Sequence, residues 1–312
     1  MALGTGPSTW AHRHLLDVDA LSRREIERVL DLALVMREAR ETRAHRRLLD
    51  LETVALAFYE PSTRTRVSFE LAAKALGATV VDLAVERSSA GKGESLVDTL
   101  RTLRRVGATI VVLRHASSGA PYLAARETDL SIVNAGDGTH AHPTQALLDA
   151  VTLREALGPL DGRRIAIVGD VAHSRVARSN VHALTALGAH VRVGGPPAWV
   201  AGFDGIPGVE VATTLADALT DADAVMTLRV QTERAAVAGI GSLAAYVDAW
   251  RLDEDRMRLA APDAPLLHPG PTNEGVELTA DLANGPRSLI GRQVEHGVTV
   301  RMAVLALVAG VA

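Results

Sequence analysis

Residues 58 to 66 read Phe-Tyr-Glu-Pro-Ser-Thr-Arg-Thr-Arg, and their side chains are suited to holding a phosphate. A β-rich run, Thr53 to Phe58, precedes the string, and an amphipathic run from Val67 to Leu76 follows it. The string is therefore predicted to lie at a helix N-terminus, where free backbone N–H groups and the helix dipole favour an anion. It adds two hydroxyls and two guanidinium groups, at Ser62, Thr63, Arg64 and Arg66. The alternative is a helix cap with two solvated arginines, and the motifs downstream favour the phosphate site.

A lysine between two glycines follows, in Ser88-Ser-Ala-Gly-Lys-Gly-Glu-Ser95. Gly91 and Gly93 indicate a loop, and Lys92 would give that loop a cation. A lysine presents a compact charge with three donors, which suits a site for anionic substrates. Taken alone, the string is more typical of an exposed polar loop.

A third group of polar residues comes after predicted strands, where open α/β sheets bind their ligands. It comprises Arg114 and the segment His142-Pro-Thr-Gln145. Pro143 in the first helical turn would place His142 near the N-cap, where a neutral imidazole can donate a hydrogen bond to a carbonyl. A structural ion pair is the alternative for Arg114. Metal binding by His140 and His142 is the weaker alternative for the histidines, since no third ligand of matching spacing occurs.

The second half of the chain carries two arginines after predicted strands. Arg175 follows the strand that ends at Val168, and Arg229 opens the segment Arg229-Val-Gln-Thr-Glu-Arg234. Taken alone, the segment from Arg229 is typical of a charged loop. With a strand before it and a second arginine nearby, it would suit a dicarboxylate, because guanidinium groups make fork-shaped contacts with carboxylates. A dinucleotide site is weakly supported, because Gly169 stands without the G-x-G-x-x-G pattern.

The string at residues 58 to 66 resembles the signature Phe-x-Glu/Lys-x-Ser-Thr/Gly-Arg-Thr of the aspartate and ornithine carbamoyltransferases. The resemblance extends from His14 to Leu305, and His142 to Gln145 match the family's H-P-x-Q. It implies that carbamoyl phosphate is bound by Ser62, Thr63, Arg64, Thr65, Ser88, Lys92, Arg114, His142 and Gln145. The catalytic residues among these would be Arg64, Thr65, Lys92, Arg114 and His142. The resemblance implies no cofactor and no metal.

The second substrate implied by the resemblance is aspartate, bound by Lys92, Arg175, Arg229 and Gln231, with Pro269 and Gly270 near both substrates. The segment Leu267-His-Pro-Gly-Pro271 matches the aspartate enzymes, whereas the ornithine enzymes carry His-Cys-Leu-Pro and a Ser-Met-Gly motif that this chain lacks. The expected products are N-carbamoyl-L-aspartate and phosphate, in pyrimidine synthesis. Glu274 departs from the arginine usual in the family, and it would either lie on the surface or weaken the binding of an anion.

Glu60 is expected to act in domain closure, because the resemblance pairs it with Arg175 and Arg234 across the domains. The alternative is a local ion pair with Arg64 or Arg66. The resemblance also implies that Ser88, with Ser89 as the close alternative, and Lys92 reach a neighbouring subunit's site, and hence a homotrimer with shared active sites. A larger assembly with regulatory chains or dihydroorotase stays open.

These residues must be positioned by alternating strands and helices, which predict an α/β fold with parallel sheets. We expect two doubly wound domains joined by long helices, with the active site in the interdomain cleft. The carbamoyl-phosphate domain would span 1–144 and the aspartate domain 145–296, and the resemblance implies that a helix at 297–312 packs back on the first domain. The predicted strands are Val54–Phe58, Thr79–Leu83, Thr109–Leu113, Ser131–Asn134, Arg164–Val168, His190–Val193 and Ala224–Leu228. The predicted helices are Ser22 to about Arg40, Val67–Leu76, Ser95–Val106, Pro121–Arg126, Pro143–Leu157, Val176–Leu187, Thr214–Leu219 and Val298–Val308.

Composition narrows the class of protein. The chain has 312 residues, enough for two domains, and a net charge of −4 that argues against a nucleic-acid binder. The absence of cysteine excludes disulfides, thiolate zinc sites and a cysteine nucleophile, and it fits the cytoplasm. We expect no signal peptide, because Met1 to His14 hold no apolar core of sufficient length, and the late apolar run from Met302 to Ala312 is too short to span a bilayer. The alternatives are a carbamoyltransferase for ornithine or another amine, a non-catalytic paralogue and, least favoured, an NAD-linked oxidoreductase.

Overall fold

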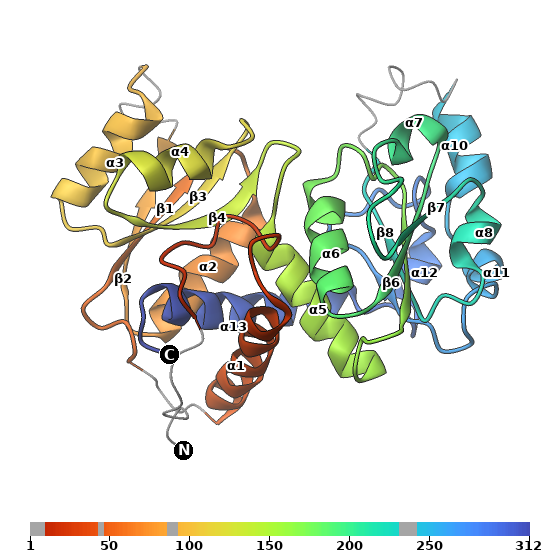
Figure 1. Ribbon diagram of the computed structural model, residues 1–312, viewed down its shortest axis with the longest axis horizontal. Coiled ribbons are helices and arrows are strands. Elements are labelled where there is room, and N and C mark those ends of the chain that lie inside the picture. The colour runs from red at the N-terminus through yellow and green to blue at the C-terminus, as the bar shows by residue number, and fades with distance from the viewer. Residues whose placement is uncertain (1–9, 43–46, 86–92, 231–241) are drawn as a thin grey trace. The chain divides into compact units, whose positions relative to one another are not determined.

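The computed structural model describes residues 10–42, 47–85, 93–230 and 242–312, and it divides the chain into two compact units (Figure 1). The first unit comprises Met1–Leu148 and Val294–Ala312, and the second comprises Asp149–Gln293. Each unit is built on its own parallel sheet, which confirms the predicted fold class. The chain passes between the units within two helices, α5 (Pro143–Leu157) and α13 (Ile290–Val308).

The sheet of the first unit has four parallel strands in the order β2-β1-β3-β4. The strands are β1 (Thr53–Phe58), β2 (Thr79–Leu83), β3 (Ile110–His115) and β4 (Ser131–Asp137). Its helices, besides parts of α5 and α13, are α1 (Arg23–Glu41), α2 (Thr63–Ala75), α3 (Leu96–Arg105) and α4 (Ala120–Glu127). Strand β1 is buried from Val54 to Ala57, as expected of a central strand covered on both faces.

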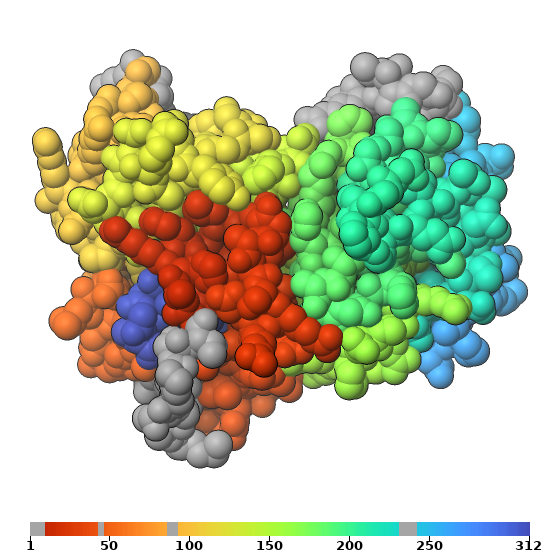
Figure 2. Space-filling view, viewed as in Figure 1, coloured from red at the N-terminus to blue at the C-terminus, as the bar shows by residue number. Residues whose placement is uncertain are grey.

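The N-terminal segment extends this sheet at the edge of β4. Leu15 bridges Val133 in parallel, its N–H donates to the carbonyl of Ile132 at 2.9 Å, and Asn134 N–H donates back to Leu15 at 2.8 Å. Leu15 is buried, so the segment pairs an otherwise exposed strand edge. The red N-terminal residues lie over the first unit in the space-filling view (Figure 2).

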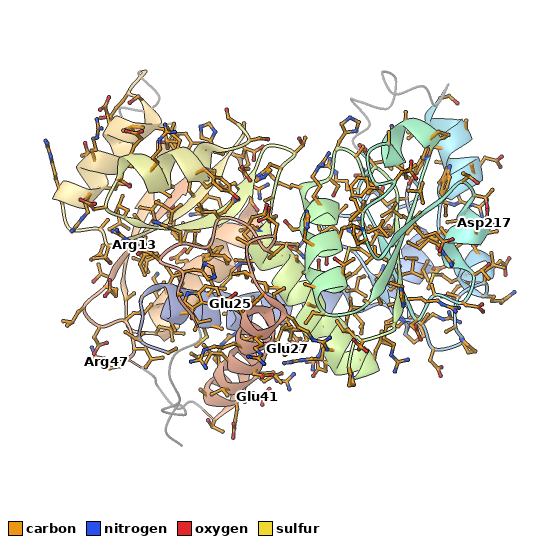
Figure 3. The ribbon with its side chains drawn as sticks, in the orientation of Figure 1. Arg13, Glu25, Glu27, Glu41, Arg47 and Asp217 are labelled. Atoms are coloured by element: carbon orange, nitrogen blue, oxygen red, sulfur yellow. The ribbon has the colours of Figure 1, made fainter. Side chains whose placement is uncertain are left out.

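Helix α1 follows this segment and begins with the capping box that the sequence predicts. The backbone N–H of Glu25 donates to Ser22 Oγ, and the Glu25 carboxylate accepts from the Ser22 N–H at 2.8 Å. Glu25, Glu27 and Glu41 all project from α1 (Figure 3). Arg23 and Glu27 form an ion pair one turn apart at 2.9 Å.

The second unit has five parallel strands in the order β7-β6-β5-β8-β9. They are β5 (Arg164–Val168), β6 (His190–Gly194), β7 (Val209–Ala212), β8 (Ala224–Thr227) and β9 (Leu266–Leu267). Its described helices, besides parts of α5 and α13, are α6 (Arg175–Ala186), α7 (Pro197–Val200), α8 (Leu215–Leu219), α10 (Leu243–Trp250), α11 (Glu254–Met257) and α12 (Ala280–Asn284). Asp217, labelled in Figure 3, lies in the first turn of α8, where the Asp217 N–H donates to the cap Thr214. The core of the second unit contains Trp199, Tyr246 and Trp250.

The structure departs from the predicted elements at several points. Helix α13 begins at Ile290, eight residues before the predicted Val298. Gly291 and Gly297 weaken the helical pattern there, but Gln293 and His296 are buried by tertiary packing, which overrides local propensity. Strands β7 and β9 were not predicted, since runs of four and two residues carry little periodicity. None of the described helices is long and apolar enough to cross a membrane.

Candidate active site

The predicted phosphate-binding residues that the structure describes lie in the first unit, at or just beyond the carboxyl ends of β1, β3 and β4. These strands are neighbours in the sheet and run parallel, so their ends share one edge. The string 58–66 follows β1, Arg114 lies in β3 near its end, and His142 comes five residues after β4. This is the edge at which open α/β sheets bind ligands.

The N-terminus of helix α2 is formed by the string itself. The helix begins at Thr63, four residues before the predicted Val67, with Ser62 as an extended N-cap. The Ser62 side chain makes no capping hydrogen bond, and the first turn contains no acidic residue. The first-turn amides, the Ser62 hydroxyl and the helix dipole therefore suit an anion.

A buried arginine of α13 packs against helix α2 next to this turn. Arg301 donates from Nη1 to Ser68 Oγ at 2.7 Å and stacks over the Phe69 ring at 5.0 Å. The Ser68 hydroxyl donates in turn to the carbonyl of Arg64 at 2.7 Å. Sequence reasoning missed Arg301, because nothing local in the sequence relates it to a turn more than 200 residues earlier.

The two arginines of the string have different environments. Arg64 is exposed at the helix N-terminus, whereas Arg66 forms an ion pair with Asp82 on β2. Thr65, between them, is buried. Arg66 is thus held toward the edge strand, and it is a weaker candidate for the anion site than Arg64.

Arg114 lies at an irregularity between β3 and β4. The pairing of Leu113 with Asn134 and of His115 with Asp137 leaves one extra residue on β4, which is a β-bulge. Arg114 Nη1 donates to the carbonyl of Ala135 in this bulge at 3.1 Å. The bulge thereby fixes the guanidinium group at the strand end.

Glu60 lies beside Arg114, with 3.8 Å between Glu60 Oε2 and Arg114 Nε. This ion pair lies within the first unit. It joins Glu60 to Arg114, whereas the local ion pair considered as the alternative to closure would join Glu60 to Arg64 or Arg66. The pairing follows from the parallel register, which places Phe58 opposite Arg114. The predicted role of Glu60 in closure stays a prediction.

His142 and Gln145 lie at the start of α5, which begins at Pro143 as predicted. Both side chains are buried, with exposed fractions of 4% and 7%. The Gln145 N–H donates to the His142 carbonyl at 3.0 Å. In the described ranges, no group of three or more His, Cys, Asp or Glu residues is arranged to hold a metal ion.

The predicted dicarboxylate residues lie in the second unit, again after the carboxyl ends of neighbouring strands. Arg175 is the first residue of α6, whose N-cap Ser174 accepts from the Ala177 N–H. Arg229 is exposed two residues after β8. Pro269 and Gly270 follow β9, which is the neighbour of β8.

A buried histidine and glutamate shape the loop that carries Pro269 and Gly270. The Gly270 N–H donates to His268 Nδ1 at 2.8 Å, so His268 Nε2 carries the proton and donates to Glu277 at 3.2 Å. Glu277 also accepts from the Asn273 N–H at 2.5 Å. Glu274 is exposed in this loop, and its effect on the binding of an anion stays a prediction.

Gly169, the glycine of the weakly supported dinucleotide site, has a packing role. It has a φ of +127°, and a Cβ there would lie 3.2 Å from both Cβ and the carbonyl oxygen of Leu228. The glycine therefore allows the ends of β5 and β8 to approach. Four predicted site residues, Ser88, Lys92, Gln231 and Arg234, lie outside the described residues.

Comparison with protein families gives two matches that together span most of the chain. Residues 13–155 match the carbamoyl-P binding domain of aspartate/ornithine carbamoyltransferases, and residues 161–308 match their Asp/Orn binding domain. The aspartate carbamoyltransferase catalytic subunit of Thermus thermophilus is 52% identical over 295 residues, covering 94% of this chain and 96% of that protein. The catalytic subunit of Gluconacetobacter diazotrophicus is 51% identical over 298 residues, covering 95% and 92%.

Solved structures show the same fold. Aspartate transcarbamoylase from Trypanosoma cruzi in complex with N-(phosphonacetyl)-L-aspartic acid has a TM-score of 0.83 and 32% identity, covering 94% of each chain. The same enzyme in complex with carbamoyl phosphate and aspartate also has a TM-score of 0.83 and 32% identity, again covering 94% of each chain. Ornithine carbamoyltransferase from Pyrococcus furiosus has a TM-score of 0.84 and 29% identity, covering 96% of this chain and 97% of that one.

Proposed function

Because this chain belongs to the aspartate/ornithine carbamoyltransferase family, we propose that it transfers the carbamoyl group of carbamoyl phosphate to L-aspartate. The products are N-carbamoyl-L-aspartate and phosphate, as in pyrimidine synthesis. The observation that carries the proposal is the α2 N-terminus at Ser62 to Thr65, at one sheet edge with Arg114 and His142. It supports an anion site in the domain that matches carbamoyl phosphate binding.

The proposed chemistry is attack of the aspartate amine on the carbamoyl carbon. The C–N bond forms, the bond from carbon to the phosphate oxygen breaks, and the phosphate leaves with the electron pair. Arg64, Thr65, Arg114 and His142 would stabilise the oxyanion and the leaving phosphate, and Gln145 would hold the carbamoyl NH₂. The departing phosphate can take the proton of the amine, so the site requires no dedicated base. Orientation of two bound substrates would supply much of the rate.

Aspartate is favoured over ornithine by sequence rather than by fold. The aspartate and ornithine enzymes match this structure equally well, with TM-scores of 0.83 and 0.84. The His268-Pro-Gly-Pro271 loop, the absence of cysteine and the relatives at about half identity favour aspartate. We assign its carboxylates to Arg175 and Arg229, with Lys92 and Gln231, because forked guanidinium groups suit two carboxylates.

We further propose a cytoplasmic homotrimer in which Ser88 and Lys92 complete a neighbouring subunit's site. The glycines around Lys92 suit a loop that extends from its own subunit. A larger assembly with regulatory chains or dihydroorotase is compatible with such a trimer. The absence of cysteine suits a reducing compartment.

The purified chain tests the function directly. Supplied with carbamoyl phosphate, it should release phosphate and form carbamoyl aspartate with L-aspartate, and it should leave ornithine unchanged. Citrulline formation from ornithine would move the chain to the other branch of the family. Binding of both substrates without turnover would instead identify a non-catalytic paralogue.

A further inference from the structure

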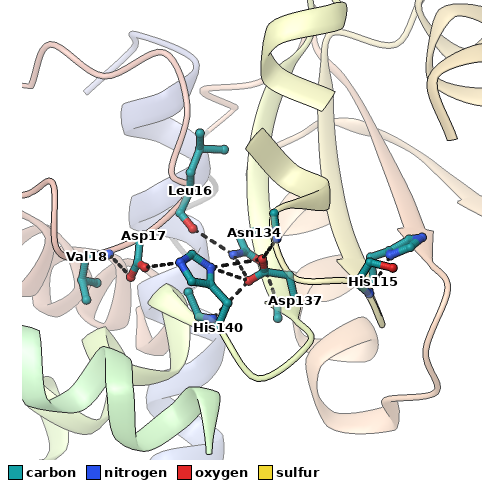
Figure 4. A network of polar contacts seen from close by, with 11 residues as sticks. Leu16, Asp17, Val18, His115, Asn134, Asp137 and His140 are labelled. Atoms are coloured by element: carbon teal, nitrogen blue, oxygen red, sulfur yellow. Dashed lines mark hydrogen bonds and ion pairs between the residues drawn. The ribbon is translucent and has the colours of Figure 1, made fainter. Parts of the chain in front are cut away.

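A completely buried aspartate closes the turn between β4 and α5. The Asp137 carboxylate accepts four hydrogen bonds, from the side chains of Asn134 and His140 and from the N–H groups of Ala141 and Gly119 (Figure 4). The distances are 2.8, 3.1, 3.1 and 2.7 Å respectively. A carboxylate with this many donors and no exposed surface is an essential part of the local structure.

The same residue closes the turn through its backbone. Asp137 N–H donates to the Ala141 carbonyl at 3.1 Å, and the His140 N–H donates to the Asp137 carbonyl at 2.9 Å. The main chain from 137 to 141 is therefore held at both ends by one residue. His142 follows directly and Pro143 begins α5, so the turn fixes the main chain that leads into His142.

His140 also brings Asp137 close to the N-terminal segment. His140 Nδ1 faces Asp137, and His140 Nε2 lies 3.6 Å from the buried carboxylate of Asp17. Asp17 is itself fixed by the Val18 N–H at 2.6 Å. The Tyr122 ring packs edge-on against His140 at 5.8 Å, and burial, with Asp17, Asp19 and Asp137 nearby, raises the Tyr122 pKa to about 12. Tyr122 thus stays neutral and adds no charge to this network at physiological pH.

We infer that Asp137 is a positioning residue for the carbamoyl transfer, which acts by fixing His142 relative to the helix α2 anion site. The inference rests on the proposed function, since it assigns His142 a contact with the reacting carbonyl. Asp137 itself is completely buried, so we expect it to act through the turn and not by touching substrate. The phosphate-binding turn at Ser62 to Thr65 belongs to a different loop, after β1, and receives no hydrogen bond from Asp137.

The Asp137→Asn variant tests this separation because it keeps the shape of the side chain. One carboxylate oxygen becomes an NH₂ group that must face at least one existing N–H donor, whichever way the amide turns. We expect kcat to fall about 10-fold to 100-fold, the effect of moving a transition-state contact by around an ångström. Inhibition by inorganic phosphate should change much less than kcat does, because the donors of the α2 turn stay in place and His142 is only one of several phosphate contacts.

Non-additivity shows whether the effect passes through His142. If Asp137 acts by placing that ring, Asp137→Asn together with His142→Ala should be no slower than His142→Ala alone. Multiplied losses in the double variant would overturn the inference, as would a full kcat in Asp137→Asn. A variant whose phosphate inhibition weakened by as large a factor as its kcat fell would show general damage and would also overturn it.

Two further variants keep the test decisive. Asp223→Asn is the control for the same change of chemistry elsewhere. Asp223 lies in the second unit, where its carboxylate accepts from the Arg164 N–H at 2.8 Å and from Arg163 Nη1 at 3.1 Å at the amino end of β5. This variant should leave kcat unchanged. If Asp137→Asn does not fold, His140→Ala replaces it, because this change keeps the backbone contacts of Asp137 and should lower kcat less, again non-additively with His142→Ala.

An NMR measurement separates failure of this inference from failure of the proposed function. With ¹³C-labelled histidine, the His142 signal is assigned by its loss in His142→Ala. Asp137→Asn should shift that signal and Asp223→Asn should not, even if the unmodified chain shows no turnover. An unmoved His142 signal in folded Asp137→Asn would overturn the positioning role.

Discussion

Arg64 and Arg66 stand two residues apart, and their environments differ, since Arg64 is exposed and Arg66 pairs with Asp82. Arg64→Ala removes an exposed guanidinium group at the α2 N-terminus, where charge develops in the proposed transition state. We expect kcat to fall about 10²-fold to 10³-fold with the fold intact, as for loss of one such donor. Steady-state kinetics and circular dichroism would check this.

Arg66→Ala is the matched control for that substitution. It removes the same chemical group from the same helical turn, but one that is paired with Asp82 on β2. An exposed ion pair contributes at most about 1 kcal/mol, so turnover should stay close to normal. Equal losses in both variants would remove the distinction between a site arginine and a structural one.

Glu60→Gln separates local pairing from the predicted closure. If Glu60 acts in closure, the change should lower kcat and weaken aspartate use, and it should leave carbamoyl phosphate affinity nearly unchanged. If Glu60 mainly orients Arg114, its neighbour at 3.8 Å, carbamoyl phosphate affinity should change instead. Binding of each substrate measured separately distinguishes the two, and small-angle scattering with a bisubstrate analogue should show less compaction only in the first case.

At the scale of elements, the N-terminal segment is held by a histidine that must be neutral. His14 Nδ1 accepts the Ile132 N–H at 3.1 Å, which a protonated ring cannot do. Burial, and then the charge of Arg13, lower the pKa of His14 from its ordinary value of 6.5. The unfolded chain therefore binds this proton more readily than the folded chain does.

The sign of the pH effect follows from this difference. The contribution of His14 to stability is complete above about pH 6.5 and is lost as the pH falls from there through the lowered folded pKa. His14→Gln keeps an acceptor without titrating, so thermal unfolding of the variant should lose less stability between pH 7 and 5 than the unmodified chain does. Identical pH dependence in both chains would show that His14 is not a source of it.

At the scale of the whole molecule, the proposed trimer predicts complementation between inactive chains. Arg64→Ala and Lys92→Ala would each lose activity, but a hybrid trimer would contain some sites with neither lesion, because Lys92 is supplied by a neighbouring subunit. Mixing and reassembly should restore part of the activity. Hybrids verified by mass that stayed inactive would rule out shared sites.

The sequence alone determined features that depend on neighbouring residues. Strand and helix periodicity predicted the two parallel sheets, and the bounds of β5 and α5 were predicted correctly. The capping box at Ser22 and the proline at the start of α5 are local signals, and both act where they were expected. The family was also evident from short motifs, since each motif is a contiguous run.

Only the tertiary structure decided which distant residues support the site. Strand order placed β1 beside β3, and thereby Glu60 beside Arg114. Packing brought Arg301 beneath the α2 turn and Gly119 onto Asp137. Such contacts join residues far apart in the chain, and their energy is realised only when the sheet has formed. No local pattern of residue types therefore encodes them, whereas helices, strands and caps are encoded within a few residues.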